Sequence, residues 1–183
     1  MLHTFVVYVE NKPGVLSRVV SLFRRRAFNI DSLTVGRTEK PDVSRMTIVT
    51  DADEDQARRI VANIYKLVNV LLVDDITNQP SLMRDLTMIK VTATIETRSQ
   101  ILELATVFRA KVLDIAAESI IVELTGGEEK VDRLLELLGP FGLLEVVRTG
   151  IVAMRRGASK SPAVASKSAG PVIVDDDTVS YSV

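Results

Sequence analysis

Residues 2–23, LHTFVVYVENKPGVLSRVVSLF, join a strand-like run to an amphipathic helix through a short turn. The first eight residues are rich in β-branched and aromatic side chains, which favour a strand. In the turn, Pro13 stands near the start of the helix, where a missing N–H costs nothing. The apolar residues of the helix form one stripe at helical spacing: Val15, Leu16, Val19, Val20 and Phe23. This stretch therefore predicts a strand, a tight turn and a helix that packs back on the strand.

The sequence that follows predicts two more strands, a second helix and a closing strand. Residues 30–37 and 43–50 are strand-like and are separated by the polar turn 38–42. Asp51 and Asp53 open the second helix, where negative side chains interact favourably with the helix dipole. A strand over residues 70–76 closes the unit, so its order is βαββαβ.

The same order recurs in the second half of the chain. Strands are predicted at 86–95, 112–116, 119–125 and 143–153, and helices at 98–110 and 128–138. The repeat predicts an α+β protein of two tandem ferredoxin-like βαββαβ units. We expect domains at residues 1–77 and 82–157, joined by a linker at 78–81. Residues 158–183 are rich in Ser, Ala, Lys and Pro at first, and we expect a disordered tail there.

Composition removes much of the usual catalytic repertoire. The chain of 183 residues has no cysteine and a single histidine, His3, which we expect to be a polar residue at a strand end. Thiolate chemistry, disulfides and His-rich metal sites are therefore excluded, and we predict neither catalytic nor metal-binding residues. The net charge of −1 and the lack of a long apolar run predict no nucleic-acid partner and no membrane span, and we expect a cytoplasmic protein.

The turn at residues 11–14 is the best candidate for a binding site. A helix N-terminus offers free N–H groups that favour a carboxylate or a phosphate, and Gly14 lets a ligand approach the backbone. Asn11 and Asn29 each offer an amide that both donates and accepts, which suits the two charged groups of an amino acid. On geometry alone, the alternative of a purely structural loop is favoured, because N-x-P-G turns occur in many structural loops.

Longer strings carry a family resemblance. Residues 11–35, NKPGVLSRVVSLFRRRAFNIDSLTV, and residues 44–49, SRMTIV, resemble the N-terminal ACT domain of acetolactate synthase small subunits. The second half resembles the C-terminal, ACT-like domain of that family through FRAK at 108–111, GPFG at 139–142 and EVVRTG at 145–150. The resemblance covers about residues 2–157. It departs at Ala27, where many relatives have glycine.

The resemblance implies a regulatory role and names the site. Such subunits activate a separate catalytic large subunit, which holds thiamine diphosphate, Mg²⁺ and usually FAD, and they confer feedback inhibition by valine in branched-chain amino-acid biosynthesis. The resemblance further implies a homodimer through the ACT domains, with valine bound between them, and no cofactor in this chain. The family's effector-binding positions correspond here to Asn11, Gly14, Val15, Leu16, Asn29 and Ile30. The second unit lacks an equivalent Pro-Gly turn.

Two other functions stay open at this point. An acylphosphatase-like enzyme would use Asn11 and Arg18 to hold a phosphate beside the first strand. A stand-alone amino-acid-binding regulator would need a DNA-binding element if it acts on DNA, and all four predicted helices are already assigned to the sheets. Arg109, Lys111 and Arg148 either contact the catalytic subunit or form a solvated charged surface.

Overall fold

The computed structural model describes residues 1–157, and the predicted disordered tail at 158–183 lies outside the described residues. The first unit has this element order: β1 Leu2–Glu10, α1 Val15–Arg25, β2 Ser32–Arg37, β3 Val43–Asp51, α2 Glu54–Ile64, β4 Val70–Asp75. The second unit follows in the same order: β5 Ser81–Thr92, α3 Arg98–Val107, β6 Lys111–Ile115, β7 Ser119–Gly126, α4 Glu128–Leu138, β8 Leu143–Arg148. A short 3₁₀ turn, Gly139–Phe141, precedes β8, and strand β9, Val152–Arg155, follows it.

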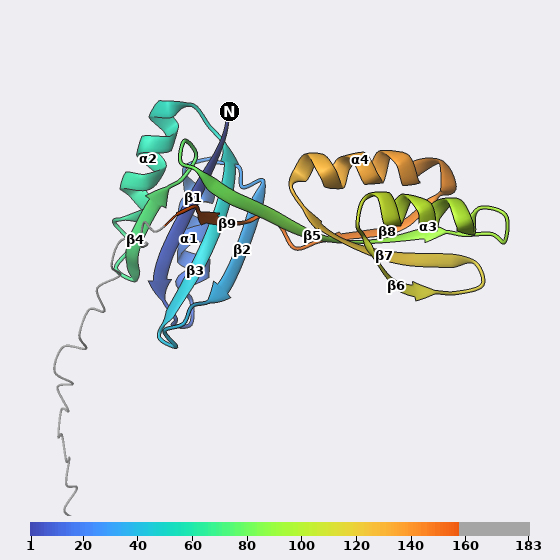
Figure 1. Ribbon diagram of the computed structural model, residues 1–183. Coiled ribbons are helices and arrows are strands. Elements are labelled where there is room, and N and C mark those ends of the chain that lie inside the picture. Colours follow the sequence, from blue (N-terminus) through green and yellow to red (C-terminus); the bar gives the residue numbers. More distant parts are fainter. Residues whose placement is uncertain (158–183) are drawn as a thin grey trace, which may run out of the picture.

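The two sheets have equivalent topologies. The first runs β2-β3-β1-β4 and the second β6-β7-β5-β8, with every neighbouring pair antiparallel. Figure 1 shows the units side by side, each with its two helices on one face of its sheet. The prediction of an α+β fold built from two ferredoxin-like units is confirmed.

Each unit has its own core between the sheet and the helices. In the first unit, Phe5, Val7 and Val9 alternate along β1 and pack beneath both helices. The helix stripe predicted from the sequence is partly wrong, because Leu16 and Val20 are each 40% exposed. The face of α1 that packs on the sheet contains these buried residues: Val15, Val19, Leu22 and Phe23. Leu16 and Val20 therefore form a separate apolar strip on the outside of α1.

Helices α1 and α3 end in the same way. In each, the residue after the C-cap has a positive φ, 55° for Ala27 and 52° for Arg109. The backbone N–H groups of Phe28 and Ala110 return to the carbonyls of Phe23 and Ala105, which is the hydrogen bonding of a Schellman motif. Position 27 therefore has the left-handed conformation that favours glycine.

The last strand differs from the prediction. The expected strand 143–153 is divided into β8 and β9 at Gly150, whose φ is 85°. Strand β5 begins at Ser81, the last residue of the predicted linker and five residues before the predicted strand 86–95, and residues 81–84 pair with β9 from Arg155 to Val152. Ile95, the last residue of the predicted strand 86–95, is 89% exposed because β5 ends at Thr92.

The ribbon formed by the start of β5 and by β9 covers the helix-free face of the first sheet. Figure 1 shows β9, in dark red, across that sheet. Ala153 is buried there in a small cluster with Val6 and Ile76. Arg45 of β3 donates to the Ala153 carbonyl, and Arg155 pairs with Asp74 of β4. The two units are therefore joined by packing and ionic contacts as well as by the chain.

Candidate functional site

The loop before α1 leaves the start of that helix open. Gly14 is the N-cap of α1, with φ 80°, and α1 begins without a side-chain cap. A Cβ at this position would meet no atom within 4 Å, so the space above Gly14 is free. Asn11 is exposed, and its Nδ2 donates to the Pro41 carbonyl at 3.0 Å. This end of the sheet therefore presents an uncapped helix start, which suits an anionic group.

The two apolar residues predicted beside this loop point in different directions. Val15 is 4% exposed and belongs to the core, whereas Leu16 is 40% exposed. A ligand above Gly14 can contact Leu16 directly. Val15 supports the helix start from below.

Asn29 and Ile30 lie just before β2. Asn29 is exposed and its Nδ2 donates to Asp31 Oδ1 at 2.9 Å, while Ile30 is half-buried against the core. Asp31 Oδ2 accepts from the backbone N–H of Asp51 at 2.8 Å. The Met1 ammonium lies 2.9 Å from Asp51 Oδ1, and this hydrogen bond and its charge lower the pKa of Asp51. Asn29 is thus held in a defined position at the head of β2.

The two halves of the predicted site lie at opposite ends of the sheet. The Asn29 carbonyl accepts from Thr50 Oγ1, and Thr50 pairs with His3 at the start of β1. Asn11 follows the other end of β1, eight residues after His3. At roughly 3.3 Å per residue, the two ends are about 26 Å apart. A single chain therefore does not bring Asn11 and Gly14 together with Asn29 and Ile30.

An open sheet edge runs between the two halves. Strand β2 is an edge strand that starts beside Asn29 and ends at Arg37, which pairs with Ser44 near the loop end. Val35 on this strand is 41% exposed, and the apolar strip of Leu16 and Val20 lies on α1. An open edge and exposed apolar residues are features of a surface that pairs with another copy.

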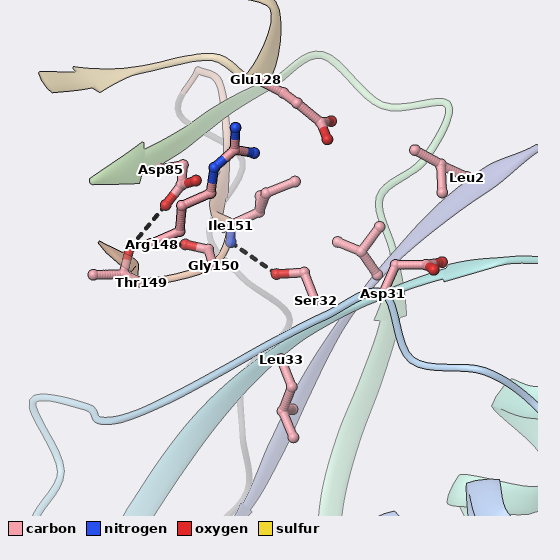
Figure 2. A pocket seen from close by; sticks show the side chains of 11 residues that line it. Leu2, Asp31, Ser32, Leu33, Asp85, Glu128, Arg148, Thr149, Gly150 and Ile151 are labelled. Carbon is pink, nitrogen blue, oxygen red and sulfur yellow. Dashed lines mark hydrogen bonds between the residues drawn. The ribbon is translucent and has the colours of Figure 1, made fainter. Parts of the chain in front are cut away.

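Side-chain contacts hold β2 to residues 149–151, the segment between β8 and β9, which we call the return segment. The backbone N–H of Ile151 donates to Ser32 Oγ at 2.9 Å, and Thr34 Oγ1 donates to the Ile151 carbonyl at 3.1 Å. Gly150 lies against both side chains, and a Cβ there would be 2.8 Å from Ser32 Oγ and 3.1 Å from Thr34 Oγ1. Figure 2 shows the bond from Ile151 to Ser32. We call these four residues, Ser32, Thr34, Gly150 and Ile151, the β2 latch. No local pattern in the sequence predicts these contacts.

Arg18 is not directed at the phosphate position that an acylphosphatase-like site requires. Its Nη1 donates to Asn69 Oδ1 at 2.7 Å, just before β4, whereas Asn11 donates toward Pro41 beyond β2. The two side chains therefore diverge, and this arrangement gives no support to the enzymatic alternative.

The remaining predicted surface residues are mostly paired. Arg148 pairs with Asp132 of α4, and Lys111 lies 3.9 Å from the Glu123 carboxylate. His3, expected at a strand end, is buried at 1% exposure and stacks on Phe5 with ring centroids 6.0 Å apart. Within residues 1–157, no group of three His, Cys, Asp or Glu could hold a metal ion, and no helix is long and apolar enough to cross a membrane.

Two family models match the sequence, one for each unit. The AHAS small subunit-like ACT domain matches residues 5–72, and the small subunit of acetolactate synthase matches residues 84–157. The boundary between the matches falls close to the start of β5.

Named relatives and a solved structure agree with these matches. The chain is 48% identical over 160 residues to a probable acetolactate synthase small subunit of Archaeoglobus fulgidus, covering 87% of this chain and 100% of the relative. It is 47% identical over 155 residues to the acetolactate synthase small subunit of Mycolicibacterium smegmatis, covering 85% and 91%. The crystal structure of the acetolactate synthase small subunit from Thermotoga maritima is similar with a TM-score of 0.80 and 38% identity, covering 86% of this chain and 98% of that one.

Proposed function

The chain belongs to the family of acetolactate synthase small subunits, and we propose that it activates a catalytic subunit and makes that subunit sensitive to valine. Its membership supports a regulatory, non-catalytic role in the enzyme. The observation that carries the finer proposal is the pair of half-sites on the first unit. One half is the uncapped start of α1 at Gly14, and the other is Asn29 with Ile30 at the head of β2.

A twofold arrangement of two copies would complete the site. If β2 pairs antiparallel with β2 of a second copy, the head of one strand lies beside the tail of the other. The tail of β2 is at the loop end of the sheet, since Arg37 pairs with Ser44 and Ser44 pairs with Val9. Each loop would then approach Asn29 and Ile30 of the partner, giving two equivalent sites in a homodimer.

The chemistry of the two halves suits valine. The N–H groups at the start of α1 would bind the carboxylate, and the amide oxygens of Asn11 and Asn29 would accept from the ammonium. Leu16 and Ile30 would provide apolar contacts for the branched side chain. We therefore assign effector binding and dimerisation to residues 1–77, and residues 82–157 form the second, ACT-like unit.

The catalytic groups belong to the partner in this proposal. Thiamine diphosphate, Mg²⁺ and FAD would be held by the large subunit, and this chain would carry no cofactor. The complex would work in the cytoplasm.

The test is an acetolactate-formation assay with the catalytic subunit, with and without this chain, across a valine titration. We expect a faster rate when the chain is added and a valine-dependent loss of that rate. Gly14→Asp should abolish the valine response and keep the activation, because it places a negative charge where the carboxylate would bind. An unchanged rate would refute the activation, and full valine sensitivity in the variant would refute the site.

Because φ at Gly14 is 80°, Gly14→Ala is the matched control. It introduces the same backbone strain without a charge. A loss of valine response in Gly14→Asp that Gly14→Ala does not share would assign the effect to charge.

A further inference from the structure

A cavity of about 330 Å³ lies where the two units meet, next to the β2 latch. Its volume is at the lower end of the range for small-molecule sites. Asp31 and Leu33 contribute from the first unit, and Asp85, Glu128 and Arg148 from the second. Figure 2 shows the residues of the second unit on one side of the cavity and Asp31 and Leu33 on the other. A molecule bound here would contact both units.

Asp85 is the most unusual residue in this wall. It is 5% exposed, and its Oδ1 accepts from Thr149 Oγ1 at 3.1 Å. Within residues 1–157, its Oδ2 has no hydrogen-bond donor and no cation within ion-pair distance. Asp85 Oδ2 is not one of the enclosed, unpartnered side-chain atoms of residues 1–157, so it is open to the cavity, and a donor that enters the cavity can bind it.

Arg148 does not satisfy Asp85. Its guanidinium pairs with Asp132 on α4, and no ion pair joins it to Asp85 within the described part of the chain. Of the charged residues that line the cavity, three are carboxylates, Asp31, Asp85 and Glu128, and Arg148 is the single cation. The cavity therefore favours a positively charged group.

The arrangement of the carboxylates and the apolar residues of the cavity wall indicate what kind of positive group would bind. Within residues 1–157, these carboxylates do not form a group that could hold a metal ion, so an organic cation fits better. Leu2, Leu33 and Ile151 add apolar surface. We propose that the cavity binds a small aliphatic compound with a primary ammonium group, which donates to Asp85 Oδ2 and Glu128. An amino acid and a simple amine share this chemistry, and the carboxylate of an amino acid would be directed to Arg148.

Three probes with one aliphatic skeleton separate these possibilities by isothermal titration calorimetry on the full chain. Isoamylamine has the ammonium alone, 4-methylpentanoate has the carboxylate alone, and leucine has both. We expect isoamylamine to bind and 4-methylpentanoate not to bind. Leucine is titrated into the Gly14→Asp variant, in which the effector site proposed above is disabled. Leucine bound there is therefore not counted as binding at the effector site, and each proposal can fail without the other. Binding of leucine more tightly than the amine would identify the ligand as an amino acid, whereas binding of the amine alone would identify an amine. Absence of binding by both would overturn the proposal.

Asp85→Asn is the decisive variant, because asparagine can keep the contact with Thr149 while losing the charge. We expect isoamylamine affinity to fall about tenfold or more, as for the loss of a hydrogen bond to a charged group. Asp114→Asn, on exposed strand β6, is the matched control and should bind as the wild type does. If Asp85→Asn does not fold, Glu128→Gln at the exposed start of α4 replaces it, with affinity again expected to fall. Unchanged affinity in a folded variant would overturn the proposal.

Discussion

Gly150→Ala tests whether the β2 latch joins the two units, and its cost can be worked from the geometry. The added Cβ would be 2.8 Å from Ser32 Oγ, closer than such contacts allow, and φ at this position is 85°. The left-handed backbone costs a non-glycine residue about 1–2 kcal/mol. Displacement of Ser32 also weakens the bond from Ile151, worth about 1 kcal/mol. We therefore expect a loss of about 2–3 kcal/mol in the free energy of unfolding.

Two variants separate the strain from the contact. Gly14→Ala has a similar φ of 80° with no atom within 4 Å of the added Cβ, so it should cost only the strain, about 1–2 kcal/mol. Ser32→Ala removes the nearer of the two side-chain oxygens that the new Cβ would meet. In that background, Gly150→Ala should cost about as much as Gly14→Ala, giving a coupling of about 1 kcal/mol between positions 32 and 150.

The measurement is equilibrium urea unfolding followed by far-UV circular dichroism, which suits a chain that has no tryptophan. The four proteins of the cycle and the Gly14→Ala variant are compared under one set of conditions. An equal cost of Gly150→Ala with and without Ser32 would refute the contact. A cost below that of Gly14→Ala would refute the reasoning as a whole.

Two further changes have expected outcomes. Ala27→Gly should raise the free energy of unfolding by up to about 1 kcal/mol in the same urea experiment, because φ of 55° is left-handed, and Arg109→Gly, at φ 52°, should act likewise. Val20→Glu should shift the proposed dimer toward monomer in sedimentation velocity, because it charges the apolar strip on α1. The control Val68→Glu, at a 76% exposed position, should leave the dimer unchanged. A Val20→Glu protein that sediments as the wild type does would rule that strip out of the interface.

The repeated fold was predictable because local signals and tertiary packing agree. The strand-forming residues of β1 and the helix pattern that follows predict neighbouring elements, and Phe5, Val19 and Phe23 from these elements share one core. The stripe on α1 was predicted too wide, since the sequence marks Leu16 and Val20 as apolar without showing which surface they serve. Each is 40% exposed on this chain, and an apolar residue kept for another copy has the same pattern as a core residue.

The ribbon and the cavity were not predictable from local sequence. Residues 81–84 pair with residues 152–155, so the strand extension depends on a contact between distant parts of the chain. Gly150 was one glycine among nine, and only its approach to Ser32 gives it a role. Asp85 lies just before the predicted strand 86–95 and was assigned no role, because burial beside another unit leaves no periodic signal.

The positions of the half-sites and of the latch bear on how an effector could act at a distance. Asn29 and Ile30 are followed within a few residues by Ser32 and Thr34, which hold Ile151 of the return segment. Their side chains face the covered side of the sheet, so the edge of β2 remains available to a second copy. A ligand bound between two copies at the head of β2 would therefore press on the same strand that holds the second unit. Because that strand is short and the latch is made of direct hydrogen bonds, a displacement of β2 has to be accommodated at residues 149–151 or in β9.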